Sequence, residues 1–390
     1  MVRFPSFMQA VILAAGRSTR TYPLTATRPK PLIPIWDRPL LGHQLRQLAG
    51  IVDEAVIVVG YRREQIEAYF GDEHAGVRLR YVAQHAQRGT ADAVLAARPF
   101  VTARTLILNG DDFYLHDDLR NLAEGGRGLL VTRAPDPENR AVVRVDDGAI
   151  TDIIEKPSAP PKDALCSVGG YALEASDLSL LDDLPLSPRG ELELPDFVLR
   201  LARKFTVRPV HIGAWWLPIT YAWDVLTAIH HIWAQPERAR DLGIVEETHE
   251  ALRARGDVTW GEEVSLQGPI RFGRSVHLGK GVRLVGPSCI GDGCIFEKGA
   301  IVERSAVFDE TRIGARARIQ DSVLGAGVHV GARGELESRP PGELDVEVKG
   351  KRVVPGLSRL GSVVGDGVHV AEGRVLPAGS LLSANLSTSK

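Results

Sequence analysis

The sequence predicts an α/β domain with a doubly wound, mostly parallel sheet, followed by a left-handed parallel β-helix. Two observations support this prediction. Between residues 8 and 230, short apolar runs alternate with amphipathic stretches, which is typical of the strands and helices of a doubly wound sheet. From about residue 262, apolar residues recur every six positions, a period of neither helices nor hairpins. We therefore expect an α/β domain over 1–230, a helical linker over 231–260 and a β-helix over 261–390.

The apolar runs of the first domain give its expected elements. The predicted strands include 10–14, 55–59, 79–83, 105–109, 128–132 and 141–145. The predicted helices are 39–50, 62–70 and 89–98. Ligands of doubly wound sheets bind beyond the carboxyl ends of the strands. Gly16 and Asp111 each follow a predicted strand, so we expect the functional site at this edge of the sheet.

The six-residue period predicts the flat faces of a triangular coil. One inserted residue separates two series of apolar positions, which are Val264, Ile270, Val276 and Val282, then Cys289, Ile295, Ile301, Val307, Ile313 and Ile319. Residues 337–356 interrupt the period and are expected to form an inserted loop, and the repeat resumes over 359–382. The ends of a solenoid need stacking or caps. Left-handed β-helix proteins are commonly trimers, so we expect a homo-oligomer through this domain.

Composition argues against several classes of protein. The formal net charge of −2 gives no general attraction for nucleic acid. Neither a signal peptide nor an apolar run of about 18 residues is recognisable, so no membrane association is expected. Cys166, Cys289 and Cys294 lack CxxC spacing, which indicates buried thiols in a reducing compartment and neither disulfides nor a zinc site. The sequence therefore predicts a cytoplasmic protein.

The loop after the first strand has the composition of a phosphate-binding site. A strand that breaks at Gly16 into a loop of small polar residues exposes several backbone N–H groups in one concavity. Arg17, Arg20, Arg28 and Lys30 add positive charge, and arginine binds phosphate oxygens through two parallel hydrogen bonds. Composition alone leaves open a second interpretation, a tight turn beside a solvated basic patch.

This loop resembles the signature of the sugar-1-phosphate nucleotidylyltransferases, LAAGxGTRLxPLTxxxPKPLxPI. Residues 13–16, 19–20, 23–25 and 29–32 match it, while Ser18 stands where the family usually has a second glycine. The resemblance implies the two-domain type of this family, with a C-terminal left-handed β-helix of hexapeptide repeats. Its members transfer a nucleoside monophosphate from an NTP to a sugar-1-phosphate and release pyrophosphate, with Mg²⁺ as cofactor.

A second segment, Gln84-x-x-Gln87-x-Gly89-Thr90-Ala91, is similar to the base-recognition motif of the same family. An amide side chain donates and accepts hydrogen bonds, so Gln84 can read N3–H and a carbonyl of uracil or thymine. This favours UTP or dTTP. A helix N-terminus capped by Thr90 is the structural alternative. The resemblance implies these nucleotide-binding residues: Leu13, Ala14, Ala15, Gly16, Arg17, Ser18, Thr19, Gln84, Gln87, Gly89 and Thr90.

The segment Asn109-Gly110-Asp111-Asp112 looks like the metal-binding motif of the family, with Asp111 in the metal position. Mg²⁺ takes one or two carboxylates, phosphate oxygens and waters. We expect Asp112 to point elsewhere, and an Asp-Asp turn is the alternative. The resemblance also implies that Arg20 stabilises the leaving pyrophosphate and that Lys30 holds phosphate. The expected catalytic residues are therefore Arg20, Lys30 and Asp111.

Glu155-Lys156-Pro157 matches the sugar-binding motif of the family, in which the glutamate binds sugar hydroxyls and the lysine meets the sugar phosphate. Other motifs of the sugar site are altered, because Ala141 replaces a glycine and Ser167 replaces an asparagine. These departures leave the sugar undetermined. The resemblance implies these sugar-phosphate-binding residues: Ala141, Glu155, Lys156, Ser167, Gly169 and Glu193.

The segment 215–226, WWLPITYAWDVL, departs most from its counterpart, WxDxGTPWDLL. Pro218 replaces the second metal-binding aspartate, and Asp224 matches a later aspartate that we expect to be structural. Two alternatives to an ordinary transferase therefore stay open. One is a catalytically weak regulatory subunit that binds a nucleotide-sugar. The other is a bifunctional enzyme with an acyltransferase in the β-helix, for which the candidate bases are His277, His329 and His369.

Overall fold

The computed structural model describes residues 7–134, 136–213, 216–244, 248–340, 344 and 346–384. The chain divides into two compact units. Unit 1 comprises Met1–Arg17 and Leu40–Pro218, and unit 2 comprises Ser18–Pro39 and Ile219–Lys390. The segment Ser18–Pro39 therefore groups with the C-terminal part of the chain.

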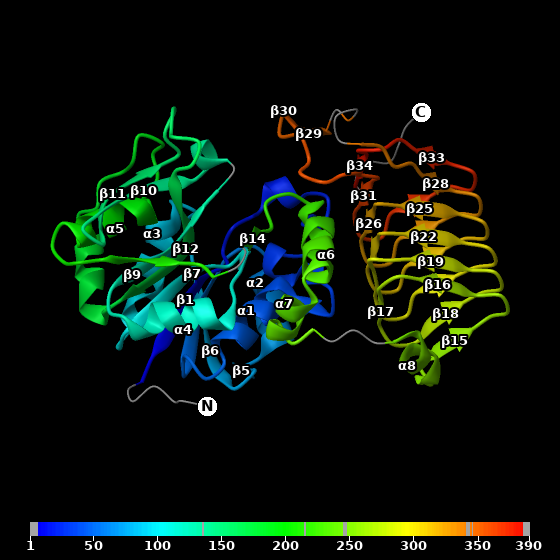
Figure 1. Cartoon of the computed structure of the whole chain (residues 1–390), viewed down its shortest axis with the longest axis horizontal. Coiled ribbons are helices and arrows are strands. Elements are labelled where there is room, and N and C mark those ends of the chain that lie inside the picture. Colours follow the sequence, from blue (N-terminus) through cyan, green and yellow to red (C-terminus); the bar gives the residue numbers. More distant parts are fainter. Residues whose placement is uncertain are drawn as a thin grey trace. The chain divides into compact units, whose positions relative to one another are not determined.

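Unit 1 is built around a mixed sheet. Its strands, with two that form a small separate ladder (β8 and β14), are β1 (Gln9–Leu13), β4 (Glu54–Val59), β5 (Glu73–His74), β6 (Val77–Ala83), β7 (Thr105–Asn109), β8 (Asp112–Phe113), β9 (Gly128–Arg133), β10 (Ala141–Asp146), β11 (Ala149–Glu155), β12 (Leu165–Leu173), β13 (Arg208–His211) and β14 (Leu217–Pro218). The order in the main sheet is β11-β10-β12-β7-β1-β4-β6-β5, and β9 pairs with both β12 and β13 (Figure 1).

All six strands predicted from apolar runs are present. Pairing is parallel from β7 through β1 and β4 to β6, which gives the expected parallel centre. The other half is antiparallel where β12 meets β7, β9 and β10. The carboxyl ends of β1 and β7 lie side by side, since Leu13 pairs with Asn109. The phosphate-binding loop and the Asp111 segment therefore start at the same edge of the sheet.

Helices bury the apolar residues on the sheet. The helices of unit 1 are α1 (Leu40–Leu48), α2 (Arg63–Phe70), α3 (Thr90–Ala97), α4 (His116–Glu124) and α5 (Leu194–Ala202). Val11 and Ile12 of β1 point to opposite faces and are both fully buried, so both faces are covered. Val94 of α3 and Phe197 of α5 join Val11 in one cluster. Burying each such side chain stabilises the fold by about 1.5–3 kcal/mol.

The N-terminal segment of unit 2 contains two 3₁₀ turns and a short hairpin, which are η1 (Thr19–Thr21), η2 (Lys30–Leu32), β2 (Pro34–Ile35) and β3 (Arg38–Pro39). Within unit 2, Arg28 Nη2 donates to Asp366 Oδ2 at 2.8 Å, and the Thr27 hydroxyl donates to the same oxygen. The other oxygen of Asp366 accepts from the Ala326 amide at 2.8 Å. One carboxylate of the coil thus holds the end of the signature segment.

The predicted helical linker, 231–260, contains the end of α6 (Asp224–Ala234), α7 (Pro236–Asp241) and α8 (His249–Ala254), while its last residues, Val258–Trp260, form a strand. The Thr248 hydroxyl caps α8 by accepting from the Ala251 amide at 3.1 Å. None of the helices in the described part of the chain is long and apolar enough to cross a membrane.

The rest of unit 2 is a left-handed β-helix whose three faces are six-stranded parallel sheets (Figure 1, yellow to red). The first face contains β15 (Val258–Trp260), β18 (Val276–Leu278), β21 (Ile295–Phe296), β24 (Arg312–Ile313), β27 (His329–Val330) and β32 (His369–Val370). The second contains β16 (Ser265–Gln267), β19 (Arg283–Val285), β22 (Ile301–Glu303), β25 (Arg318–Gln320), β28 (Glu335–Leu336) and β33 (Val375–Leu376). The third contains β17 (Ile270–Phe272), β20 (Ser288–Ile290), β23 (Ala306–Val307), β26 (Val323–Leu324), β31 (Val363–Val364) and β34 (Leu381–Leu382).

The hexapeptide repeat is confirmed, but its predicted phase was wrong at Cys289, Ile295 and Ile301. The later predicted positions Val307, Ile313 and Ile319 are core residues. The inward-facing positions that include Val276 and Val282 continue at intervals of six, without an insertion, to Cys294 and Ala300, which are fully buried. Cys289 is not one of these inward-facing positions. It pairs with Arg271, and the next residue, Ile290, pairs with Phe272 and belongs to the core. The later change is a shortening, because Ile290 pairs with Val307, one residue sooner than a full coil of three hexads.

The predicted insertion contains a hairpin, β29 (Val346–Val348) and β30 (Lys351–Val353). Val346 is 1% exposed and lies against the last coil, since a Cβ on Gly379 would come within 3.1 Å of it. The insertion therefore covers apolar surface at the C-terminal end of the solenoid, where stacking ends.

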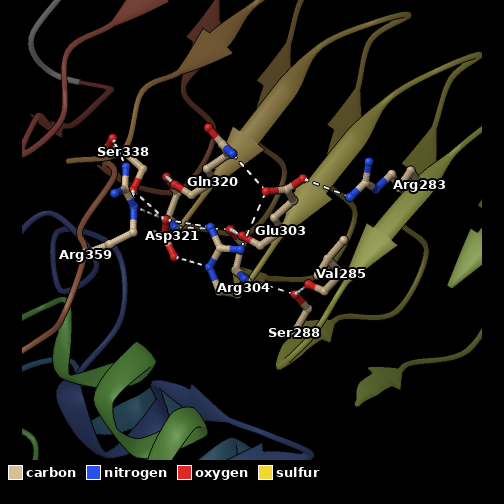
Figure 2. Close-up of polar contacts among 11 residues, drawn as sticks. Arg283, Val285, Ser288, Glu303, Arg304, Gln320, Asp321, Ser338 and Arg359 are labelled. Atoms are coloured by element: carbon tan, nitrogen blue, oxygen red, sulfur yellow. Dashed lines mark hydrogen bonds and ion pairs between the residues drawn. The ribbon is translucent and has the colours of Figure 1, made fainter. Parts of the chain in front are cut away.

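Buried polar side chains on the β-helix satisfy one another from coil to coil. The Ser288, Ser305 and Ser322 hydroxyls accept from the amides of Ser305, Ser322 and Ser362 at 3.0, 3.1 and 3.0 Å. Beside this ladder, Arg304 donates two hydrogen bonds to the buried Asp321, at 2.7 and 3.0 Å (Figure 2). Because these groups have partners, they replace apolar residues in the repeat without leaving unpaired buried donors or acceptors.

Candidate functional site

The start of the phosphate-binding loop is held by backbone contacts at the end of β1. The Ala14 amide donates to Val58 O at 2.9 Å, and the Gly110 amide donates to Leu13 O at 3.0 Å. The sequence analysis missed Gly60, whose role appears only in the packing. A Cβ on Gly60 would lie 2.6 Å from Ala15 O, and one on Gly110 would lie 2.5 Å from Leu13 O. Both glycines therefore leave the space that this loop occupies.

The continuation of the signature belongs to unit 2. Ser18 has φ of 49°, a left-handed conformation that glycine adopts more easily, which explains the glycine at this position in related sequences. The Ser18 carbonyl compensates by accepting from the hydroxyls of Thr21 and Thr25 at 2.7 and 3.0 Å. Thr19 and Arg20 are exposed, whereas Lys30 is 5% exposed at the start of η2.

The base segment, defined as residues 84–91, forms the turn between β6 and α3. The Gln84 side-chain amide donates from Nε2 to Gly89 O at 3.1 Å and to Asp92 Oδ2 at 2.9 Å. Gln87 Nε2 donates to Ala15 O at 3.0 Å, so it connects the base segment to the phosphate-binding loop. Two residues predicted from separate motifs, Gln87 and Ala15, are therefore in direct contact within unit 1.

Gly89 and Thr90 connect the base segment to residues 192–194. Gly89 has φ of 120°, and a Cβ there would lie 2.3 Å from Leu192 O. The structural alternative, a helix capped by Thr90, is wrong, because the N-cap residue of α3 is Gly89 and Thr90 is the first residue of the helix. The Thr90 hydroxyl instead accepts from the Leu194 amide at 2.9 Å.

The two aspartates after β7 differ in their surroundings. Asp112 is 3% exposed and accepts from Asn109 Nδ2 at 3.1 Å and from Trp216 Nε1 at 3.0 Å. Its partners therefore fix it as a structural carboxylate. Pro218 pairs with Asp112 in the ladder between β14 and β8, and a proline there supplies no metal ligand. Asp111 is partly exposed at the strand end.

Asp224 has a structural role in unit 2. Its Oδ2 accepts from the Thr220 and Tyr221 amides at 2.7 and 2.8 Å at the start of α6. Among the described residues, no group of three or more His, Cys, Asp or Glu side chains is arranged to hold a metal ion. Asp111 with substrate phosphates and waters still suits Mg²⁺, which needs few protein carboxylates. Trp215 lies outside the described residues.

The predicted sugar-binding residues gather on β10, β11 and α5. Ala141 pairs directly with Glu155. Lys156 Nζ lies 3.5 Å from Glu155 Oε1. Burial raises the pKa of Glu155, and Lys156 and Arg189 oppose this effect without cancelling it. Glu193 is 3% exposed at the N-terminus of α5.

Arg189 joins the two glutamates and was missed by the sequence analysis. Arg189 Nη2 lies 2.6 Å from Glu193 Oε1 and 3.7 Å from Glu155 Oε1. The Ser187 hydroxyl also donates to Glu193 Oε1 at 3.1 Å. We call Glu155, Lys156, Arg189 and Glu193 the sugar-side cluster. The available signal was the RGELEL segment, in which Arg189 lies four residues before Glu193.

The remaining sugar motif lies on β12. Ser167 Oγ accepts from the Gly169 amide at 3.2 Å and lies 3.3 Å from the Tyr171 hydroxyl. Gly169 has φ of 76°, and a Cβ there would lie 1.9 Å from Asn109 Nδ2. This close approach brings the Ser167 motif and the Asp111 segment together in unit 1.

Comparisons with known proteins define the class of this protein. Residues 9–224 match the family model described as nucleotidyl transferase, and residues 266–386 match the model described as GMPPB C-terminal domain. The chain therefore belongs to the nucleotidyl transferase family, and the resemblance seen in its motifs is confirmed. It is an enzyme of the nucleotidyltransferase class with a hexapeptide-repeat β-helix.

Several relatives match over both domains, and two of them are described here. One is named bifunctional protein GlmU, from Methanococcus maripaludis, and is 29% identical, with 97% of this chain and 94% of the relative covered. The other is named bifunctional sugar-1-phosphate nucleotidylyltransferase/acetyltransferase, from Sulfurisphaera tokodaii, and is 30% identical, with 94% and 91% covered. A solved structure of a putative glucose-1-phosphate thymidylyltransferase from Bacillus anthracis has a TM-score of 0.51 and 26% identity. The match covers 62% of this chain and 98% of the chain in that structure.

Proposed function

We propose that this protein transfers a nucleoside monophosphate from UTP or dTTP to a sugar-1-phosphate, giving an NDP-sugar and pyrophosphate. The observation that carries the proposal is the junction in unit 1 where Ala15 of the phosphate-binding loop, Gln87 of the base segment and the backbone beside Glu193 are tied together. The residues proposed to bind the nucleotide and those proposed to bind the sugar are thus connected by hydrogen bonds within unit 1. The family match and the names of the two-domain relatives support the same reaction class.

The chemistry asks the protein mainly for positioning and charge neutralisation. A phosphate oxygen of the sugar-1-phosphate attacks the α-phosphate in line, and pyrophosphate leaves. The attacking group is already anionic, so no protein base is needed. Arg20 stabilises the leaving pyrophosphate, while Lys30 and Lys156 hold the two phosphates. Asp111 would hold Mg²⁺ together with phosphate oxygens and waters, and the ion would supply positive charge that offsets the negative charge of the phosphates.

The sugar-side cluster suits a hydroxyl-rich substrate. Glu155 and Glu193 present carboxylate oxygens that accept hydrogen bonds from sugar hydroxyls. Lys156 beside Glu155 can meet the adjoining phosphate. Glucose-1-phosphate and its N-acetylamino analogue are the first sugars to test.

The regulatory alternative rests on Pro218. A proline beside Asp112 leaves Asp111 as the carboxylate that this motif offers to a metal. In that case the protein would bind nucleotide and NDP-sugar without appreciable turnover. Intact Arg20, Lys30 and Asp111 favour the transferase.

The β-helix supports acyl transfer as a second candidate function. The rings of His329 and His369 lie on neighbouring coils with centroids 4.6 Å apart, whereas His277 lies on the third strand away from His329. Burial and the neighbouring His369 lower the pKa of His329, which favours the neutral form that a base requires. The two relatives above are named as bifunctional proteins, one as an acetyltransferase. An acetyl-CoA acceptor assay with a His329→Ala variant tests this activity.

The proposed transferase is tested by pyrophosphate release from the purified protein with Mg²⁺, across a panel of nucleoside triphosphates and sugar-1-phosphates. Asp111→Asn should abolish release. Asp117→Asn is a matched control, because Asp117 is 76% exposed on α4. Release that requires one sugar and one class of base supports the proposal. A folded protein that binds nucleotide without releasing pyrophosphate supports the regulatory alternative.

Light scattering on the same sample tests the proposed homo-oligomer.

A further inference from the structure

The side-chain amide of Gln84 has no donor left for a base. Its two N–H groups are matched by two acceptors, Gly89 O at 3.1 Å and Asp92 Oδ2 at 2.9 Å. A glutamine carries two amide hydrogens and one carbonyl oxygen. The hydrogen-bonding group that Gln84 still offers to a ligand is therefore Oε1, which only accepts. This differs from the sequence-based expectation that Gln84 also donates to a carbonyl of the base.

Asp92 fixes this orientation of the amide. A carbonyl oxygen and a carboxylate both accept only, so a flipped Gln84 would set its oxygen against two oxygens. Arg88 donates to the other oxygen of Asp92 from Nε and Nη2, at 3.1 and 2.7 Å, which holds the carboxylate in place. Asp92 is 6% exposed, whereas Gln84 is half-buried and the Arg88 side chain is 68% exposed.

We infer that Asp92 is a positioning residue that makes Gln84 an acceptor and thereby selects bases with a ring N–H on the pairing edge. This inference rests on the proposed function, in which Gln84 faces the base. Uracil and thymine carry N3–H, and guanine carries N1–H, so each donates to Gln84 Oε1. Adenine and cytosine carry an acceptor at the corresponding ring nitrogen, N1 or N3, which would face Oε1 with like partial charge. Their donors on this edge are exocyclic amines, which lie to one side of that nitrogen. The site therefore favours UTP, dTTP or GTP over ATP and CTP.

The variant Asp92→Asn tests the inference directly. Arg88 is a donor, so it keeps the amide oxygen of the new side chain on its own side. The new amide nitrogen then faces Gln84, so that Gly89 O alone still favours the wild-type orientation. The flipped amide, which offers N–H groups to the base, therefore becomes populated. Wild-type protein is expected to bind UTP at least tenfold more tightly than ATP. In Asp92→Asn this ratio should fall at least tenfold.

Titration calorimetry of UTP and ATP, without sugar-1-phosphate, provides the readout. A general loss of structure would weaken both nucleotides and leave their ratio unchanged, so the ratio isolates the positioning role. Asp117→Asn on the exposed side of α4 should keep the wild-type ratio. Gln84→Ala removes the reading group and should bring the ratio close to one, even if Asp92→Asn fails to fold.

Two results would overturn the inference. One is a wild-type protein that binds ATP as tightly as UTP. The other is a folded Asp92→Asn or Gln84→Ala variant that keeps the wild-type ratio. Failure of the proposed function is seen separately, as binding with this base preference but no pyrophosphate release from any pair of substrates.

Discussion

The base segment and the sugar-side cluster of unit 1 are built in different ways. The base segment presents one neutral amide whose orientation is fixed by Asp92 and Gly89. The sugar-side cluster presents a buried carboxylate, Glu193, and a half-buried carboxylate, Glu155, which share one arginine, Arg189. Neutral hydrogen bonds depend on geometry, whereas paired buried charges depend on both partners and on pH. Changes on the two sides should therefore be separable in kinetics.

The largest effect is expected from the geometry of the base segment. Gly89→Ala adds a Cβ 2.3 Å from Leu192 O at φ of 120°, so the backbone has to move. We expect a loss of more than about 3 kcal/mol in the free energy of unfolding, from strain and the clash together. Denaturant unfolding measures it. Gly126→Ala is the matched control, because Gly126 also has positive φ, 80°, but meets nothing within 4 Å. It should cost about 1 kcal/mol.

The next effect concerns charge on the sugar side. Arg189→Ala leaves the buried Glu193 without its ion-pair partner. Removing one partner of a buried pair is costly, so we expect kcat/KM for the sugar-1-phosphate to fall about 100-fold. The KM for the nucleotide should change little. Arg98→Ala breaks a pair whose side chains are 36% and 58% exposed and should have no measurable effect. Equal losses for both substrates would contradict the separation of the two sides.

A smaller effect should appear as pH dependence. Burial raises the pKa of Glu155 above its ordinary value, so it is protonated at a higher pH than a solvated glutamate. As pH falls through the raised pKa, the KM for sugar-1-phosphate should rise. The free energy of unfolding should rise as pH falls, because a raised pKa in the folded state favours folding at low pH. This contribution is lost as pH rises through the raised pKa.

Glu155→Gln separates these contributions. It should raise the KM for sugar-1-phosphate about tenfold at neutral pH, since one charged acceptor is lost. The free energy of unfolding should stay equal or rise, because a buried charge is removed. In this variant, the remaining pH dependence of the KM for sugar-1-phosphate is expected to come from the substrate phosphate. Glu138→Gln, at an exposed position, is the control. A variant with the wild-type pH profile of KM would contradict the role of Glu155.

The contrast also explains what the sequence could predict. The strands follow from local apolar runs such as that of β4, in which every residue is buried. The phosphate-binding loop follows from a long contiguous motif. The phase of the β-helix could not be read after Val282, because Cys289, Ala306 and Val323 are apolar and buried on the outer column of the third face. Apolar residues on both sides of a strand hide its phase.

The contacts of the site were harder to predict than its residues. Asp92 looks in sequence like an ordinary acidic residue in the first turn of a helix. Its contact with Gln84 exists because Gly89 turns the backbone at φ of 120°. Arg189 is 34 positions from Glu155, and only the fold brings them within 3.7 Å. A sequence motif gives the residue types of the site, but contacts such as Gln84–Asp92 and Glu155–Arg189 depend on the fold.

The smallest predicted effect concerns the hydrogen bond that joins the two sides. Thr90→Ala removes the acceptor of the Leu194 amide, at 2.9 Å, and should cost about 1 kcal/mol. Because Thr90 belongs to the base segment and Leu194 follows Glu193, both KM values should rise together, by about two- to fivefold. Thr90→Ser keeps the hydroxyl and should restore both. A rise confined to one substrate would show that the two sides are positioned independently of this bond.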